Sequence, residues 1–493
     1  MEKNLTEQEI IRREKADKLI ERGINPYGSR FDRTSNSKLI KDTYETFDHD
    51  YFLDKEYLVK VAGRVVLKRG QGKAGFMNIL DKFGVIQVYV KLDLVGEESF
   101  FIYSQSDLGD ILGIEGTIFR TMTNELTIKA RQVTQLSKAL RPLPDKFHGL
   151  QDIEETRRKR YLDLITSVDA RKVAFARPKI IRTIQNYLDN LGFVEVETPI
   201  LQATLGGASA RPFKTHHNTL DMDFNLRIAT ELHLKRLIVG GMEAVYEIGR
   251  LFRNEGMDAK HNPEFTTIEA YLAYSDIYGM MDLVENIFHE VSVNVCQTTT
   301  VNFDGKEINL AKPFKRIHMV DAIKNVTNID FFTIFDFEVA KKLAIDNGIK
   351  VEKHFSIGHI IEAFFDKFVE PTIVQPTIIY GHPLEISPLA KKSEKDPRFT
   401  DRFELFIASS EYANAFSELN DPLDQKERFL NQLKEKNLGN DEASEYDADF
   451  IEALEYGMPP TGGIGIGIDR LVMLITNTPN IRDVILFPHL KNK

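Results

Sequence analysis

Charged side chains recur at alternate positions in residues 245–274, VYEIGRLFRNEGMDAKHNPEFTTIEAYLAY. The pattern is typical of two strands joined by a polar loop, and we predict a β-hairpin. Arg253 and Glu255 lie two residues apart in the first strand, as Glu269 and Tyr271 do in the second, so each pair shares a strand face. Charges on a covered face are costly to remove from water unless a ligand or partner interacts with them. The hairpin therefore predicts a binding cleft in which a guanidinium could hold phosphate or carboxylate oxygens.

A second segment, GGIGIGIDRLVMLI at residues 462–475, lacks side chains on one strand face. Gly463, Gly465 and Gly467 alternate with isoleucines, and Asp469 begins the predicted helix that carries Arg470. A strand that is bare on one side suits a flat ligand lying against the backbone. The spacing is neither that of a dinucleotide-binding GxGxxG turn nor that of a P-loop. Glycines in a strand can also mark tight sheet packing, and on this segment alone that alternative stays open.

A third segment, RPKIIRTIQNYLDNLGFVEVETPIL at residues 177–201, has apolar residues at helical spacing followed by a predicted strand that ends at Pro199. By itself it is an ordinary amphipathic helix and strand. Together, and in their order along the chain (177–201, 245–274 and 462–475), the three segments resemble motifs 1, 2 and 3 of the class II aminoacyl-tRNA synthetases. In that family motif 1 is the dimer element, and motifs 2 and 3 bind ATP.

The resemblance implies catalytic roles for two arginines. Arg253 would contact the α-phosphate of ATP and the amino-acid carboxylate, and Arg470 would cover the adenine and reach the γ-phosphate. Glu404 and Glu411 resemble the family's Mg²⁺ ligands, which hold up to three ions with ATP. The complete set of expected ATP contacts is Arg253, Glu255, His261, Asn262, Phe265, Glu404, Asn414, Gly467 and Arg470.

The charge of the amino-acid pocket distinguishes the aspartyl, asparaginyl and lysyl members, which share an N-terminal OB-fold. An ammonium substrate needs carboxylates, whereas aspartate needs a basic group. Glu418 resembles the carboxylate that binds the ε-amine in lysyl enzymes, and Glu231 the one that binds the α-amine. Taken alone, Glu418 could instead be a surface or ion-paired carboxylate. The expected lysine contacts are Gly207, Glu231, Glu269, Tyr271, Asn414, Phe416 and Glu418.

The N-terminal part of the chain has the alternation of a small β-barrel. From Tyr57 to Ser137 the order is three strands, a helix and two strands. This is the connectivity of an OB-fold, which often binds single-stranded nucleic acid; another small barrel is the alternative. By the family resemblance Phe76 and Gln87 would read the tRNA anticodon. A core role for Phe76 remains the alternative.

We predict an α+β protein with an N-terminal OB-fold β-barrel and a class II synthetase catalytic domain built on an antiparallel β-sheet flanked by helices. The N-terminal helix and anticodon-binding barrel would span 1–145, a linker 146–160, and the catalytic domain 161–493. Between motifs 2 and 3, residues 275–400 would form a mostly helical insertion. The basic run at 157–160 could be a solvated helix face or could contact RNA phosphates.

The composition, 42% hydrophobic and 28% charged in 493 residues, is that of a packed protein with more than one folding unit. The single cysteine, Cys296, excludes an intrachain disulfide. No apolar run is long enough for a membrane span or signal peptide, so we expect a cytoplasmic protein. Residues 1–150 carry 24 Lys+Arg against 22 Asp+Glu, net +2, and the remainder carries 40 against 52, net −12. The N-terminal third is therefore the more favourable part for nucleic acid.

The resemblance as a whole implies an ATP-dependent ligase that attaches L-lysine to tRNA(Lys) and acts as a homodimer. Two alternatives remain. The first is a relative that transfers lysine from the same adenylate to a protein, although such relatives lack the barrel. The second is a noncatalytic nucleic-acid-binding relative, which the intact Arg253, Glu404, Glu411 and Arg470 disfavour.

Overall fold

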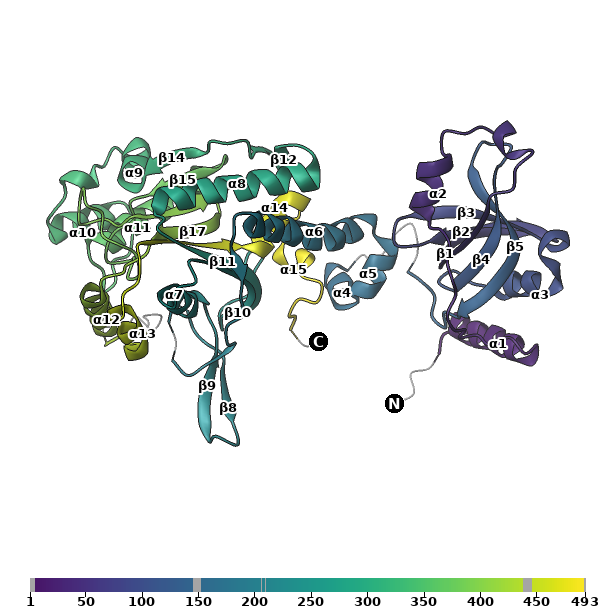
Figure 1. Cartoon of the computed structure of the whole chain (residues 1–493), viewed down its shortest axis with the longest axis horizontal. Helices are drawn as coiled ribbons and strands as arrows, with labels where there is room; N and C mark the ends of the chain where they lie inside the picture. Colours follow the sequence, from purple (N-terminus) through teal and green to yellow (C-terminus); the bar gives the residue numbers. More distant parts are fainter. Residues whose placement is uncertain (1–4, 145–151, 205, 209, 438–445, 492–493) are drawn as a thin grey trace. The chain divides into compact units, whose positions relative to one another are not determined.

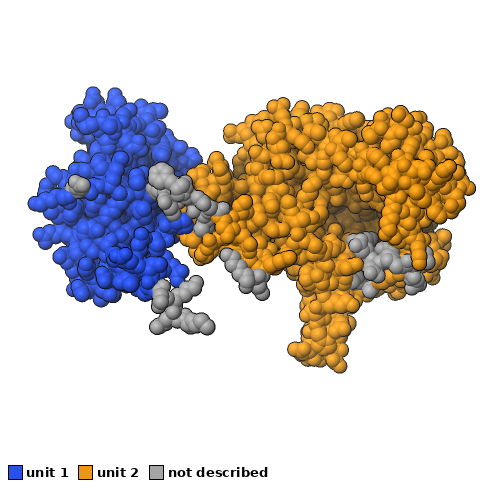
Figure 2. Space-filling view, turned by 180° about the vertical axis from the view of Figure 1, so that it is seen from behind, with its two compact units in different colours: residues 1–150 blue, residues 151–493 orange. Residues whose placement is uncertain are grey.

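The chain divides into two compact units, residues 1–150 and 151–493, coloured blue and orange in Figure 2. The computed structural model describes residues 5–144, 152–204, 206–208, 210–437 and 446–491. Within these residues, no helix is both long and apolar enough to cross a membrane.

In the described part of unit 1, five strands form a closed barrel in the order β1-β2-β3-β5-β4 (Figure 1). Only β3 and β5 pair in parallel, and the other neighbours are antiparallel. Helix α3 lies between β3 and β4 in the chain, so the predicted OB-fold connectivity is confirmed. The barrel elements are β1 (Leu58–Gln71), β2 (Ala74–Leu80), β3 (Val85–Lys91), α3 (Leu92–Gln105), β4 (Ile111–Arg120) and β5 (Leu126–Ser137).

Helices α1 (Glu7–Glu21) and α2 (Ser37–Tyr44) and a single turn, η1 (Asp50–Phe52), precede the barrel. Thr6 and Glu9 form a capping box that starts α1, because each side chain accepts from the other's backbone N–H. The helix ends before Gly23, whose φ of +74° suits glycine. The buried side chains of the strands and of α3 make one apolar core inside the barrel.

Within the described residues, unit 2 is built on an eight-stranded sheet that is antiparallel except for the pairs β6–β10 and β14–β15. The predicted sheet-based α+β class is confirmed. In spatial order the strands are β14 (Lys315–His318), β15 (Thr377–Tyr380), β16 (Arg402–Phe406), β17 (Glu411–Ser417), β18 (Thr461–Gly467), β11 (Glu264–Ala273), β10 (Ala244–Phe252) and β6 (Val194–Glu195).

Helices α6 (Val168–Asn190), α8 (Ile277–Cys296) and α14 (Ile468–Thr476) cover one face of this sheet (Figure 1). Their apolar side chains form the main core with those of β11, β17 and β18. The other face is left for polar residues near its centre, because strand side chains alternate between the two faces. The remaining helices of this unit are α4 (Ile153–Arg158), α5 (Arg160–Thr166), α7 (Glu231–Val239), α9 (Met319–Thr327), α10 (Phe337–Asp346), α11 (Ile357–Phe364), α12 (Pro422–Asn437), α13 (Ala448–Glu455) and α15 (Ile481–Val484).

Two small sheets complete unit 2. Strands β8 (Lys214–His217) and β9 (Met222–Leu226) form a hairpin that projects from the unit (Figures 1 and 2), and β9 also pairs with β7 (Leu201–Gln202). Strands β12 (Thr300–Phe303) and β13 (Lys306–Asn309) pair with each other.

Residues 275–400, predicted as a mostly helical insertion, also contribute to the main sheet and its covering layer. They supply α8, which covers the sheet, and the strands β14 and β15 at its edge. Their other helices share a separate apolar core with the helical turns η2 (Phe331–Thr333) and η3 (Phe365–Val369), and the short turn η4 (Glu370–Thr372) follows η3. Short strands of this kind carry too few residues for a clear period-two signal in the sequence.

Two local predictions differ from the structure. Strand β10 ends at Phe252, so Arg253 and Glu255 lie in the connecting loop and not on one strand face. The motif 1 helix begins at Val168, nine residues before the predicted segment, where Ser167 caps it.

The predicted linker, 146–160, lies partly outside the described residues. From Ile153 onward it is helical and belongs to unit 2. All four residues of the basic run at 157–160 form ion pairs inside this unit, Arg157 with Asp483 at 2.8 Å for example. These pairs support the interpretation of the run as a structural helix surface.

Candidate active site

Strand β18 forms the floor of a cleft because three of its residues have no side chain. Gly463, Gly465 and Gly467 alternate with isoleucines that are buried in the main core on the other face. A Cβ on Gly463 would lie 2.0 Å from Oε1 of Glu418 and 2.6 Å from the ring of Tyr271. Glycine is therefore required where these cleft side chains approach the backbone.

The strand register places polar residues beside these glycines. Gly465 pairs with Glu269 on β11 and with Asn414 on β17, and Asn414 pairs with Glu404 on β16. The next row on the same face consists of Tyr271, Gly463, Phe416 and Arg402. Two adjacent rows across four strands thus place polar and aromatic side chains on either side of the glycines.

The cleft has a volume of about 510 Å³. It brings together every residue of unit 2 that the sequence singled out for ATP, lysine or metal binding. These are Gly207, Glu231, Arg253, Glu255, His261, Asn262, Phe265, Glu269, Tyr271, Glu404, Glu411, Asn414, Phe416, Glu418, Gly467 and Arg470. Their common location agrees with one binding site, while the group that each residue binds stays a prediction.

Arg253 is held at the start of the loop between β10 and β11. Its backbone N–H donates to the carbonyl of Pro263 at 2.9 Å, and its guanidinium lies 5.2 Å from the ring centroid of Phe265. Its Nε is buried and has no hydrogen-bond partner among the described residues. A buried N–H without a partner is rare and marks a place where a ligand oxygen could bind.

The loop itself is organised by Asp258. The carboxylate of Asp258 accepts from the backbone N–H groups of Lys260 and His261 and from Nδ1 of His261, at 2.7 to 3.0 Å. Nε2 of His261 lies 3.5 Å from the guanidinium of Arg470, so the ring points into the cleft. Asn262 stabilises the base of the hairpin by donating to the carbonyl of Glu264 at 2.6 Å.

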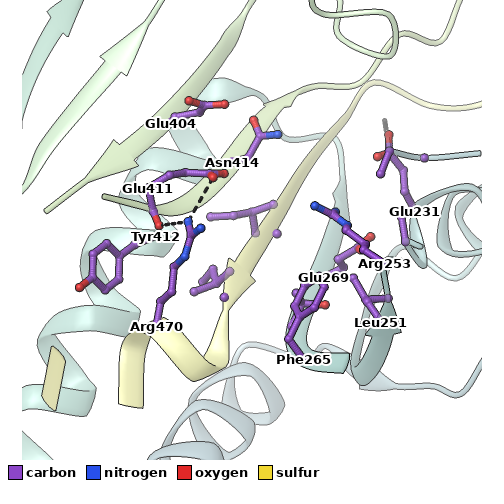
Figure 3. A pocket seen from close by; sticks show the side chains of 18 of the residues that line it. Glu231, Leu251, Arg253, Phe265, Glu269, Glu404, Glu411, Tyr412, Asn414 and Arg470 are labelled. Carbon is purple, nitrogen blue, oxygen red and sulfur yellow. Dashed lines mark hydrogen bonds and ion pairs between the residues drawn. The ribbon is translucent and has the colours of Figure 1, made fainter. Parts of the chain in front are cut away.

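Arg470, on α14, reaches across to β17. It donates to the backbone carbonyl of Glu411 and lies 3.3 Å from the Glu411 carboxylate. Figure 3 shows this pair on one side of β18, with Arg253 and Phe265 on the other. Burial of part of its side chain and the nearby carboxylate of Glu404 raise the pKa of Glu411.

Arg402, which the sequence analysis missed, positions two of these residues. Its guanidinium donates to Oε1 of Glu404 at 2.6 Å and to Oδ1 of Asn414 at 3.0 Å. Its alternation with Glu404 on β16 was a signal that could have revealed it, since both lie on the cleft face.

One network joins the three motif segments. Arg177 on α6 pairs with Asp469 at 2.5 Å and donates to the hydroxyl of Thr266 on β11 at 3.0 Å. The other oxygen of Asp469 accepts from the backbone N–H of Thr266 at 2.6 Å. Arg470 is therefore fixed by the residue before it, which the sequence analysis placed only at a helix start.

At the other end of the cleft, three carboxylates are buried together. Glu231, Glu269 and Glu418 each expose less than a tenth of their surface. Burial, together with Glu231, raises the pKa of Glu269 to about 7, and burial raises that of Glu418 well above its usual value. The hydroxyl of Tyr271 donates to Glu269 at 3.2 Å.

Backbone geometry at two further positions shapes this end. Thr230 stands before α7, but its hydroxyl forms no capping hydrogen bond; its backbone N–H donates to Glu269 at 3.2 Å. Gly207 has a φ of +87°, and a Cβ there would lie 3.1 Å from Cβ of Glu231. Gly207 thus lets the chain pass close to Glu231.

Lys235 is a second residue that the sequence analysis missed. Its side chain is fully buried, and Nζ lies 2.6 Å from Oε1 of Glu231 and forms an ion pair with Oε2 of Glu418. The spacing of four residues between Glu231 and Lys235 on a helix was the available signal. The sequence did not show that Glu418 would meet the same ammonium.

In unit 1, Phe76 lies on a different surface, the outer face of the barrel. Phe76 on β2 faces Tyr89 on β3 with ring centroids 4.9 Å apart, and Arg69 lies 5.5 Å from the ring of Phe76. Phe76 is half-buried and is not part of the barrel core. Gln87, on the same face of β3 as Tyr89, is buried, and its Oε1 accepts from the hydroxyl of Thr127 at 3.3 Å. An aromatic surface with a nearby guanidinium is suited to stacking bases.

Comparisons with known proteins agree with both units. Residues 152–491 match the family described as tRNA synthetases class II (D, K and N), and residues 59–136 match the OB-fold nucleic acid binding domain. The lysine–tRNA ligase of Streptococcus sanguinis (strain SK36) is 59% identical over 488 residues, 99% of this chain and 98% of its own length. Those of Streptococcus pneumoniae (strain CGSP14) and Streptococcus gordonii (strain Challis) are each 58% identical over the same shares of both chains.

Proposed function

This chain belongs to the class II tRNA synthetases of the D, K and N group, and we propose that it uses ATP to join L-lysine to tRNA(Lys). The observation that carries the choice of lysine is the group of three buried carboxylates at one end of the cleft: Glu231, Glu269 and Glu418. An aspartate substrate would bring another carboxylate into that pocket, which Coulomb repulsion would oppose. The lysine–tRNA ligases named above support the same choice.

The first reaction step forms an adenylate. An oxygen of the lysine carboxylate bonds to the α-phosphorus of ATP, the bond from that phosphorus to the bridging oxygen breaks, and pyrophosphate leaves with the electron pair. Arg253, whose Nε is buried without a partner, contacts the carboxylate and the α-phosphate and stabilises the charge that develops between them. No side chain becomes covalently bound, so positioning and electrostatics provide the catalysis.

The second step moves lysine to tRNA. A terminal ribose hydroxyl attacks the lysyl carbonyl, the mixed anhydride bond breaks, and AMP leaves. The hydroxyl proton passes from the ribose oxygen to a phosphate oxygen of the departing AMP as the ester forms. The cleft is lined by Arg253 at the reacting end and by the carboxylate group at the lysine end, so lysine lies between them.

The adenine and outer phosphates occupy the side of the cleft near motif 3. Phe265 stacks on the base opposite Arg470, Glu255 accepts from the adenine amine, and His261 approaches the outer phosphates. Asn262, Asn414 and Gly467 complete the ATP contacts. This arrangement is supported by the position of Arg253 and Phe265 on one side of β18 and Arg470 on the other (Figure 3).

The donor set fits magnesium. Glu404 and Glu411 supply carboxylate oxygens within one cleft, and each lies close enough to an arginine to be held in place. Among the described residues no group of three or more His, Cys, Asp and Glu side chains is arranged to hold a metal ion. Mg²⁺ commonly uses one or two carboxylates with waters and substrate phosphates, so two are sufficient. Bound there with ATP, Mg²⁺ would neutralise phosphate charge.

The barrel of unit 1 binds the anticodon through Phe76 and Gln87. Stacking on an aromatic ring and hydrogen bonding to an amide are usual ways of reading unpaired bases. The described structure supports this by the ring of Phe76 outside the core and the nearby Arg69.

The protein forms a homodimer through the motif 1 region and acts in the cytoplasm, where tRNA and ATP meet in protein synthesis. Support for the dimer comes from large apolar side chains that are exposed on α5, α6 and the segments after it, namely Tyr161, Val168, Leu191, Val194, Ile200 and Leu201. Exposed apolar residues gathered in one region of the chain are typical of interaction surfaces. Light scattering should give twice the 56.5 kDa of one chain.

The test of the function is ATP–pyrophosphate exchange with each of the twenty amino acids, with Mg²⁺ and without tRNA. Exchange with lysine alone, followed by lysine transfer to tRNA(Lys), supports the proposal. Exchange with aspartate or asparagine rejects the substrate but keeps the family, and no exchange favours a noncatalytic relative. Exchange with lysine but transfer to a protein, unaffected by tRNA depletion, favours a protein-lysylating enzyme.

A further inference from the structure

Lys235 lies next to the lysine end of the cleft without lining it. Its side chain is fully buried on α7, and Nζ contacts Glu231 and Glu418, two residues that do line the cleft. Nζ is also 5.3 Å from the ring centroid of Phe416. A lysine is almost never fully buried unless it is paired, so the charge of Lys235 is expected to act on the carboxylates that it contacts.

The pair with Glu418 uses only one carboxylate oxygen. Oε2 of Glu418 meets Lys235, whereas Oε1 is buried and has no hydrogen-bond partner among the described residues. Oε1 points over the bare strand, because a Cβ on Gly463 would lie 2.0 Å from it. Lys235 thus leaves one oxygen of Glu418 available on the cleft side.

The charges around Lys235 do not balance. Glu231 on the same helix, Glu269 on β11 and Glu418 after β17 supply three carboxylates, and Lys235 is the one ammonium in contact with them within the described residues. Tyr271 on β11 is uncharged, because burial and these carboxylates raise its pKa. On α13, Phe450 faces the ammonium at 6.0 Å and Asp447 pairs with Arg236 instead. With all three carboxylates ionised, two negative charges remain, and a ligand that supplies two cations favours this state over the protonated one to which burial shifts Glu269 and Glu418.

We propose that Lys235 is a positioning and specificity-determining residue of the lysine pocket, which holds Glu231 and Glu418 in place and sets the pocket's charge to accept a ligand with two ammonium groups. This inference rests on the proposed function. Free lysine has two ammonium groups, and its carboxylate is bound by Arg253. Lysine thus balances the two remaining carboxylate charges, and Lys235 itself does not touch the substrate.

Loss of the internal ammonium would leave three carboxylates close together. Like charges in a buried site cannot all stay ionised, so at least one carboxyl would bind a proton and become a poor partner for the substrate ammonium. The acid limb of kcat/KM for lysine would then move to higher pH. Burial opposes the charged form of Lys235, but the carboxylates of Glu231 and Glu418 have the larger effect, so the pKa of this ammonium is raised.

The experiment compares Lys235→Met and Lys235→Gln with the wild type in lysine-dependent pyrophosphate exchange across pH. We expect KM for lysine to rise on the order of 100-fold. KM for ATP should stay within about two-fold, and the lysine acid limb should shift to higher pH. Arg236→Met is the matched control: it removes a cation from the next position of α7, where the partners are Asp447 and Asp449 outside the cleft. It should lower thermal stability without moving the pH limb.

Each outcome decides the proposal. Folded Lys235 variants with an unchanged lysine KM and pH limb overturn it, while a normal wild-type exchange leaves the proposed function standing. Absence of lysine-dependent exchange in the wild type rejects the proposed function and this inference together. If neither variant folds, Lys235→Arg, which keeps the cation but changes its reach to Glu418, is measured in the same assay. A raised lysine KM with an unchanged KM for ATP supports the proposal, and a lysine KM equal to that of the wild type overturns it.

Discussion

The two ends of the cleft handle charge differently. At the nucleotide end, His261 and Glu411 keep 55% and 42% of their side chains exposed, and Arg470 binds a backbone carbonyl as well as a carboxylate. At the lysine end, Glu231, Glu269, Glu418 and Lys235 are all buried. Solvent screens charges at the first end, whereas at the second end each charge must be matched by another.

This difference explains why one fold can serve related enzymes. Phosphates can be bound by arginines with free donors, whichever amino acid is used. In the proposal made above, the amino acid is instead selected by the number of charges that a dry pocket leaves unbalanced. Substitutions at the two ends should therefore have separable effects on ATP and on lysine.

The largest effect is expected at the nucleotide end. Arg253→Ala should lower kcat for pyrophosphate exchange by about 10²- to 10³-fold, because a donor to the developing charge is lost. Steady-state exchange kinetics would measure it. Arg250→Ala, on the same hairpin, removes a half-exposed arginine that pairs with Glu264 outside the cleft and should change little. Similar losses in both variants would contradict the role given to Arg253.

At the lysine end, Glu418→Gln should raise KM for lysine by about 100-fold and change KM for ATP little, because it leaves an ammonium without its buried carboxylate. The same exchange assay, with each substrate varied in turn, would measure this. Glu455→Gln, on the exposed end of α13, is the control. Equal increases in both KM values would remove the distinction between the two ends.

The pH dependence of stability and of its increase on adding lysine should also arise at the lysine end. The pKa of Glu269 is about 7 in the folded protein against an ordinary 4.5, so its ionisation destabilises the free protein increasingly as pH rises from 4.5 to 7, by about 3 kcal/mol in total. Lysine should offset this loss, so the Tm gain on adding lysine should be greater at about pH 8 than at about pH 5.5. Scanning calorimetry tests it, with norleucine as the ligand that lacks the second ammonium. A gain that is independent of pH would refute the assignment.

The smallest effect is expected from the barrel, which should influence neither end of the cleft. Phe76→Ala should raise KM for tRNA by about ten-fold through lost stacking, with pyrophosphate exchange unchanged. Aminoacylation assays with varied tRNA would show it. Phe83→Ala removes an exposed phenylalanine in the turn between β2 and β3 and is the matched control. If Phe76→Ala slowed exchange as well, the barrel would not be a separate binding element.

Much of the architecture was predictable because it depends on local patterns. Period-two alternation and a helix between the third and fourth strands predicted the barrel, and the three motif segments led to the family. Harder to predict were Arg253 and Glu255, which lie beyond the end of β10 although their spacing is that of a strand. Polar residues beyond a strand end can continue the alternation, so the sequence does not mark the boundary.

By itself, the sequence determined which residue types were available: glycines on one strand face, arginines in two motifs, and carboxylates where a cationic substrate would need them. Only the tertiary structure decided how these groups were paired. Arg177 meets Asp469 and Lys235 meets Glu418, both across segments that are distant in the chain. Local periodicity specifies the face on which a side chain lies, but the packing of sheet and helices specifies which distant charge lies opposite it, and in a buried site that pairing sets the protonation and hence the binding.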